Sequence, residues 1–111
     1  MAKLQGYRGA SKWKVVVGDR TYDSKKEAGV AQQLQWREHA REIHGLRYQV
    51  RFDIVINDIK VCTYIADFTY KDESGREVVV DAKSDYSRKD KVYRLKKKLM
   101  HAVYGITIQE L

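Results

Sequence analysis

The sequence predicts one α+β domain with a central mixed sheet, on the strength of two observations. Three consecutive apolar segments rich in Val, Ile, Phe and Tyr indicate strands, with polar turns between them. Segments with helical spacing of apolar residues precede and follow these strands, and a short apolar segment comes last. A chain of 111 residues has room for one compact domain, so we expect residues 1–111 to fold as a unit.

The N-terminal part is expected to contain an arm, a hairpin and the first helix. Residues 1–11 are basic and glycine-containing, which indicates a flexible arm. Trp13–Val17 and Thr21–Tyr22 predict a short hairpin. Ser24 precedes Glu27 by three residues, the spacing of a capping box at a helix start. We expect this helix to run to residue 43 or 44 and to stop at Gly45.

Three strands follow, and their turns predict an antiparallel meander. We expect strands at Leu46–Ile56, Val61–Tyr70 and Arg76–Lys83. Asn57-Asp58 and Asp72–Gly75 supply the turn residues between them.

The C-terminal part is expected to return through a helix to the same sheet. A polar loop at Ser84–Arg88 leads to a helix at Lys89–Tyr104, which Gly105 ends. Ile106–Glu110 is the last strand, and the helical connection predicts that it lies parallel to its neighbour.

Composition favours a polyanionic partner and excludes several other classes. Lys and Arg number 22 against 15 acidic residues, for a net charge of +7 and a pI near 9.5. Such a balance favours nucleic acid, because neutralised phosphates release counterions. No apolar run is long enough to span a bilayer, and no secretory h-region is evident. The single cysteine, Cys62, suits a reducing cytoplasm and cannot form a structural zinc site by itself.

Two acidic residues are predicted to face one another across the second and third strands. A three-residue loop, residues 73–75, puts Gly75 at the left-handed position and sets Asp67 directly opposite Asp81. Lys83 then shares the face of Asp81, because strand side chains alternate. A four-residue loop would separate the faces. The two acids could also be solvated surface groups with Lys83 as their ion-pair partner, but both lie in apolar runs where an unpaired carboxylate is costly.

These residues resemble the acid…(D/E)-x-K signature of the PD-(D/E)xK nuclease superfamily, which has a restriction-endonuclease-like core with the order α-β-β-β-α-β. Asp81-Ala82-Lys83 stands fourteen residues after Asp67. Further blocks resemble a small phage-encoded family in that superfamily, similar to Holliday-junction resolvases, namely Asp23–Ala28, Tyr64–Phe68, Val79–Lys83 and Tyr93–Leu99. The chain departs from the pattern in having Ala66 before the first acid, Asp rather than Glu as the second acid, and Ser84 after the lysine.

The resemblance implies a site and a reaction. Asp67 and Asp81 would ligate Mg²⁺ or Mn²⁺, with the backbone carbonyl of Ala82 as a further ligand. Lys83 would orient or activate the attacking water, and Glu27 would hold the metal or its water. The expected reaction is phosphodiester hydrolysis that leaves a 5′-phosphate.

Glu27 and Lys96 could each have a structural role instead of a catalytic one. Glu27 could serve only the capping box, although it shares a helical strip with Ala31 and Leu34. Lys96 lies at the edge of a predicted apolar stripe formed by Val92, Leu95, Leu99 and Val103, so it either lies along the core or reaches a phosphate.

Basic and aromatic residues of the loop and the second helix are expected to bind nucleic acid, though a solvated loop is the alternative. They are Tyr86, Arg88, Lys89, Lys91, Arg94 and Lys97. We therefore expect a metal-dependent DNA endonuclease, acting as a homodimer in the cytoplasm (the host's, if phage-encoded), with no small-molecule cofactor. Branched DNA such as a Holliday junction would suit two symmetric sites. A non-catalytic binding module and a ribonuclease are the alternatives.

Overall fold

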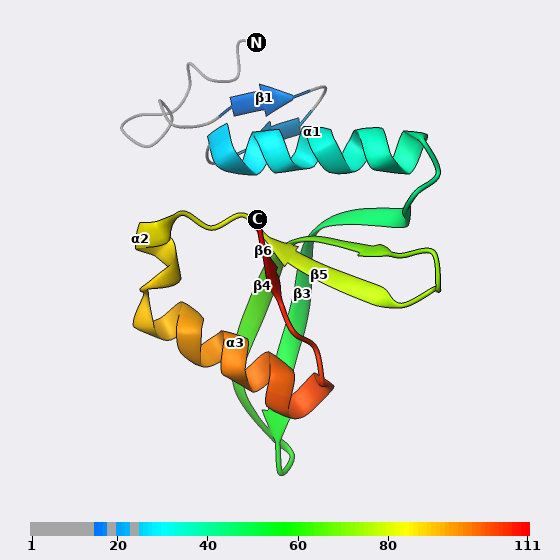
Figure 1. Ribbon diagram of the computed structural model, residues 1–111. Helices are drawn as coiled ribbons and strands as arrows, with labels where there is room; N and C mark the ends of the chain where they lie inside the picture. Colours follow the sequence, from blue (N-terminus) through cyan, green and yellow to red (C-terminus); the bar gives the residue numbers. More distant parts are fainter. Residues whose placement is uncertain (1–14, 18–19, 23–24) are drawn as a thin grey trace.

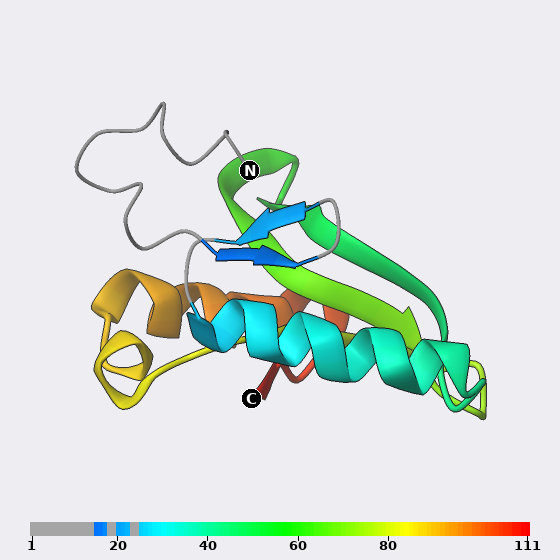
Figure 2. The ribbon, with the colours of Figure 1, turned by 90° about the horizontal axis from the view of Figure 1, so that it is seen from above.

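The computed structural model describes residues 15–17, 20–22 and 25–111. It begins with an antiparallel hairpin of β1 (Val15–Val17) and β2 (Arg20–Tyr22), which confirms the predicted hairpin. Figures 1 and 2 show this hairpin lying beside helix α1 (Lys25–His39). The predicted arm at 1–11, Trp13 and the predicted cap Ser24 lie outside the described residues.

The central sheet has the strand order β3–β4–β5–β6. The strands β3 (His44–Ile56), β4 (Ile59–Lys71) and β5 (Glu77–Asp81) form an antiparallel meander. Strand β6 (Gln109–Glu110) pairs with β5 in the parallel direction. The predicted α+β class and mixed sheet are confirmed.

The first helix ends earlier than we expected, at His39 rather than near residue 43. The N–H of Glu42 donates to the carbonyl of Arg37, and the N–H of Arg41 donates to that of Glu38. This is the hydrogen-bond pattern of a Schellman motif, with Arg41 at φ 66° in the left-handed position. Because the left-handed residue is an arginine and not a glycine, the sequence carried no obvious stop signal here. Gly45, the expected stop, lies inside β3.

Two further expectations about the C-terminal part are corrected. The segment expected to be a loop contains a short helix, α2 (Asp85–Arg88). Helix α3 (Lys91–Tyr104) has Asp90 as its N-cap and Gly105 at φ 70° as its C-cap. The first half of the predicted apolar stripe does not face the core, since Val92 is 59% and Leu95 is 58% exposed. The core-facing residues of α3 are instead Tyr93 and Met100, with Leu99 packed against them.

The turns of the meander have the conformations that their residues favour. Asn57 and Asp58 have φ angles of 52° and 65°, as a two-residue hairpin turn of type I′ requires. Gly75 has a φ of 83°, and the N–H of Asp72 donates to the carbonyl of Arg76 at 3.0 Å. The three-residue loop at 73–75 is therefore the one that the sequence predicted.

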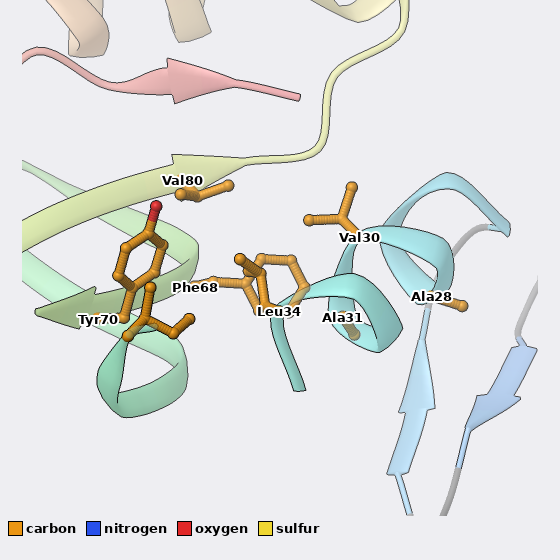
Figure 3. Packing of buried hydrophobic residues seen from close by; sticks show 8 residues of the cluster. Ala28, Val30, Ala31, Leu34, Phe68, Tyr70 and Val80 are labelled. Carbon is orange, nitrogen blue, oxygen red and sulfur yellow. The ribbon is translucent and has the colours of Figure 1, made fainter. Parts of the chain in front are cut away.

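Helices α1 and α3 pack against different faces of β5. Val80 lies in a cluster with α1 residues, whereas its neighbour Val79 lies in a cluster with α3 residues. Figure 1 shows α1 above the upper end of the sheet, and α3 crossing the lower part of β3 and β4. Figure 3 shows the α1 cluster, in which Leu34 lies against Phe68 of β4. The end of β5, where Asp81 lies, is thus held by apolar packing on both sides.

Candidate active site

Asp67 and Asp81 are joined by reciprocal hydrogen bonds across β4 and β5. The strand pairing Phe68↔Val80, extended by one residue, sets Asp67 opposite Asp81, as the sequence predicted. The N–H of Asp67 donates to Oδ1 of Asp81 at 3.2 Å, and the N–H of Ala82 donates to Oδ2 of Asp67 at 3.0 Å. Backbone donors thereby hold both carboxylates in place despite their like charge.

Strand β4 changes its packing partner at Asp67. The preceding residues Tyr64 and Ala66 pack with α3, whereas Phe68 and Tyr70 pack with α1. Simple strand alternation would have put all four side chains on one face of one cluster. The site therefore lies where the hairpin passes from one helix to the other.

The neighbouring strand β3 has an unusual backbone at the same level. Gln49 has a φ of 51° although it is not glycine, which is costly in a strand. Its amide nitrogen Nε2 donates to Oε2 of Glu27 at 3.0 Å and to Oδ1 of Asp67 at 3.5 Å. Gln49 thus links the predicted helical acid to the first strand acid. Glu27 itself is only 7% exposed, so it points inward from α1 rather than into solvent.

Asp81 is a buried carboxylate with a strongly perturbed pKa. Asp81 is only 2% exposed to solvent, and its Oδ2 accepts a 2.5 Å hydrogen bond from the hydroxyl of Tyr64. Burial raises the pKa of Asp81 to about 7, and the charge of Asp67 adds to the effect. The Tyr64 hydrogen bond and the charge of Lys83 act in the opposite direction. Burial and Asp81 together raise the pKa of Tyr64.

Lys83 is held between a carboxylate and an aromatic ring. Its Nζ lies 3.8 Å from Oδ2 of Asp81 and 4.1 Å from the centre of the Tyr93 ring. A cation over an aromatic face is attracted by the ring quadrupole. The side chain is largely shielded, with 21% relative exposure, so the ammonium has few alternative positions.

The acids and Lys83 open onto one pocket of about 280 Å³ between β4, β5 and α3. Lys96 also lines this pocket, from α3. The pocket thus brings together Asp67, Asp81, Lys83 and Lys96, four of the five residues that the sequence predicted to be catalytic. Glu27 is absent from its lining and joins the site through Gln49.

The hydroxyl of Tyr93 belongs to a second network of hydrogen bonds and ion pairs. This hydroxyl donates to Oε2 of Glu110 at 2.6 Å, and the same carboxylate pairs with Lys97 at 3.0 Å and Arg88 at 3.2 Å. Burial and Glu110 raise the pKa of Tyr93. Burial by itself would raise the pKa of Glu110, but its hydrogen bonds from Tyr93 and Lys97 hold that pKa below the usual value. Tyr93 therefore connects Lys83 to a basic cluster on α2 and α3.

The predicted nucleic-acid-binding residues fall into three groups. Arg88 and Lys97 are engaged with Glu110. Arg94, Lys89 and Lys91 are exposed on α3 or just before it. The side chain of Tyr86 lies outside what the structure describes, although its backbone is part of α2.

The sequence-based predictions missed the roles of two tyrosines, Tyr64 and Tyr93. A buried tyrosine normally needs a partner for its hydroxyl, and Tyr64 stands three residues before Asp67. That combination was a signal available in the sequence. Nothing in the sequence indicated that Tyr93 would contact Lys83, because the contact depends on how α3 docks.

The donor atoms at the site fit a magnesium-type cation. Within the described residues, no three His, Cys, Asp or Glu side chains gather in a way that could hold a metal ion. Mg²⁺, however, commonly uses one or two carboxylates and takes waters and substrate phosphates as its other ligands. Asp67 and Asp81 supply such a pair. Burial disfavours the negative charge of Asp81, and a bound cation would offset that cost.

Residues 7–108 match the DUF1064 family, which is described as a protein family of unknown function. The chain belongs to the DUF1064 family. No curated protein and no solved structure matches it. Over residues 15–17, 20–22 and 25–111, no helix is long and apolar enough to cross a membrane.

Proposed function

We propose that this protein is a metal-dependent endonuclease that hydrolyses DNA phosphodiester bonds. The observation that carries the proposal is the reciprocal hydrogen bonding of Asp67 and Asp81, with Lys83 beside Asp81 in one pocket. Two carboxylates and a lysine in one pocket are the groups needed to bind a divalent cation and a phosphodiester. The resemblance of these residues to the PD-(D/E)xK pattern, and their place in a restriction-endonuclease-like order of elements, support the same reaction.

Asp67 and Asp81 would hold Mg²⁺ or Mn²⁺, with the backbone carbonyl of Ala82 as a further ligand. Glu27, which Gln49 links to Asp67 by hydrogen bonds, would hold the metal or a water bound to it. Such an ion supplies Lewis acidity to the scissile phosphate and to the attacking water. The Ala82 N–H already orients Asp67, so its peptide lies against the acid that would bind the metal.

The lysines act on the substrate. Lys83, fixed by Asp81 and the Tyr93 ring, orients the attacking water and offsets phosphate charge. Lys96, on the α3 wall of the pocket, contacts the scissile phosphate or its neighbour. The expected product carries a 5′-phosphate.

The net charge of +7 supports a nucleic-acid substrate. A second copy of the chain is proposed as a partner, because Ile59 and Val61 of β4 are 66% and 51% exposed on the outer face of the hairpin. Two symmetric sites would suit branched DNA, for instance a Holliday junction, in phage replication or recombination. The proposed site of action is the host cytoplasm.

The test is a cleavage assay on labelled linear duplex, single-stranded DNA, a four-way junction and RNA, each with Mg²⁺, Mn²⁺ or EDTA. The variant Asp81→Asn removes one site carboxylate. The matched control is Asp58→Asn, which removes the same charge from an exposed turn whose conformation suits asparagine.

We expect the wild type and Asp58→Asn to cut DNA only with metal, and Asp81→Asn to bind DNA without cutting it. Cleavage of RNA alone would make the protein a ribonuclease. Binding without cleavage under every metal would leave a nucleic-acid-binding module and overturn the catalytic proposal.

A further inference from the structure

A second pocket, on the other side of α3, has no part in the proposed cleavage chemistry. Its volume is about 440 Å³, and residues from α2, α3 and the end of the chain at 107–110 line it. We refer to it as the α3–β6 pocket. It shares no lining residue with the catalytic pocket. Its volume is in the range of small-molecule and cofactor sites, about 300–1,000 Å³.

The charge of the α3–β6 pocket favours an anion. Five basic side chains line it, namely Arg88, Arg94, Lys97, Lys98 and His101, against the single acid Glu110. Glu110 is already engaged by Arg88, Lys97 and Tyr93. Within the described residues, Arg94 and Lys98 make no ion pair, so two cations remain to bind a phosphate.

The wall of the pocket also suits a planar ring. Much of its lining is apolar, and Ile108, only 3% exposed, belongs to the α3 core cluster. The stems of lysine and arginine add further apolar surface, and a guanidinium or imidazole plane can stack on a base. A phosphate alone would not need such a wall, whereas a nucleotide would use both the cations and the apolar surface.

We propose that the α3–β6 pocket binds one unpaired nucleotide of the substrate, with its phosphate on Arg94 and Lys98 and its base against the wall at Ile108. A base inside a duplex is stacked on both faces, so only an unpaired or extruded base can enter a pocket of this kind. The inference rests on the proposed function, because it assigns a substrate class, DNA with an unpaired region, to the same enzyme.

The α3–β6 pocket lies close to the proposed catalytic pocket. Lys96 lines the catalytic pocket, and the next residue, Lys97, lines the α3–β6 pocket. One helix, about 10 Å across with its side chains, therefore separates them. Tyr93 touches both sides, with its ring against Lys83 and its hydroxyl on Glu110. A nucleotide held here would anchor the strand close to the scissile bond.

The first test is a chemical-shift titration of the full chain in EDTA with thymidine 5′-monophosphate, inorganic phosphate and thymidine. We expect the monophosphate to bind more tightly than either part and to shift the amides of Thr107 and Ile108. Arg94→Ala/Lys98→Ala should weaken it by about tenfold, equivalent to about 1.4 kcal/mol. The matched control Lys71→Ala/Arg76→Ala removes the same charges from the exposed end of β4 and the turn that follows, and should leave binding unchanged.

The second test compares the affinity of Asp81→Asn for blunt duplex and for the same duplex with a single-stranded overhang. The overhang should raise the affinity, and the added Arg94→Ala/Lys98→Ala change should remove that gain. No shift change with the monophosphate, or an equal loss on both DNAs, would overturn the inference. Neither readout needs cleavage, so this failure is distinguishable from a failure of the nuclease proposal.

Discussion

The ammonium group of Lys83 lies 4.1 Å from the centre of the Tyr93 ring, while the hydroxyl of that tyrosine donates to Glu110. One side chain thus makes two separable contacts, because its ring faces Lys83 and its hydroxyl faces Glu110 in the basic cluster. Substitutions that remove only one of them can tell which contact positions Lys83.

Tyr93→Phe keeps the ring and should keep cleavage within about threefold, while losing about 1 kcal/mol of stability with the hydrogen bond. Tyr93→Leu removes the ring face and should lower kcat about fivefold, with little change in KM, because a cation–π contact is worth about 1 kcal/mol. Steady-state cleavage kinetics and denaturant unfolding give the two quantities. Equal losses of kcat in both variants would show that the ring does not position Lys83.

The raised pKa of Asp81 predicts a pH-dependent stability of the metal-free protein. A pKa of about 7 in the folded state, against 3.8 as the ordinary value, means that folding takes up a proton between these values. Because the unfolded state binds fewer protons there, the free energy of unfolding should fall as pH rises from about 4 to 7. The loss from this group should be at least about 1 kcal/mol.

Denaturant unfolding in EDTA from pH 5 to pH 8 measures this contribution as the difference between the wild type and Asp81→Asn. The asparagine variant should lose less stability over that interval and should be relatively more stable at pH 8. Parallel profiles for the two proteins would contradict the assignment of the titration to Asp81.

Divalent metal should stabilise the folded protein through the same carboxylates. Mg²⁺ or Mn²⁺ at about ten times its Kd should add about 1.4 kcal/mol, visible as a rise in Tm at pH 8. Asp67→Asn and Asp81→Asn should abolish the rise, whereas Asp58→Asn should keep it. A rise that survives in both site variants would place the metal elsewhere.

Gln49 offers a test of backbone strain against side-chain bonding. Both Gln49→Ala and Gln49→Gly lose the hydrogen bonds to Glu27 and Asp67. Only glycine also relieves the left-handed φ of 51°. The glycine variant should therefore be more stable than the alanine variant, by about 1 kcal/mol in denaturant unfolding. If alanine proves the more stable, the backbone at this position does not store strain.

The proposed dimer predicts an effect of charge on the outer face of β4. Val61→Glu should shift the protein toward the monomer in sedimentation or light scattering, since a symmetric contact would bring two glutamates together. Leu95→Glu, at a comparably exposed apolar residue of α3, serves as the control and should leave the mass unchanged. Identical masses for the wild type and both variants would remove the β4 face as the interface.

Local signals in the sequence were sufficient for most of the meander. Gly75 can adopt the left-handed conformation, so the three-residue loop and the register opposing Asp67 to Asp81 followed from the turn residues. The predicted end of α1 was wrong because Arg41 takes the left-handed position that glycine usually holds. The prediction of which face of α3 contacts the core was wrong because it followed the aliphatic residues only. The ring of Tyr93 packs in the core instead.

By itself, the sequence determined that two carboxylates would face one another on neighbouring strands. The expected strand to Lys83 was too long, because β5 ends at Asp81 and the lysine lies just beyond it. Alternation along a strand and the length of a hairpin loop are local properties, so they can be read from adjacent residues. Only the tertiary structure decided what surrounds them. The change of packing partner along β4 at Asp67, the link from Glu27 through Gln49 and the contact of Tyr93 with Lys83 depend on how two helices pack against one sheet. Such packing joins segments far apart in the chain, and no local pattern specifies it.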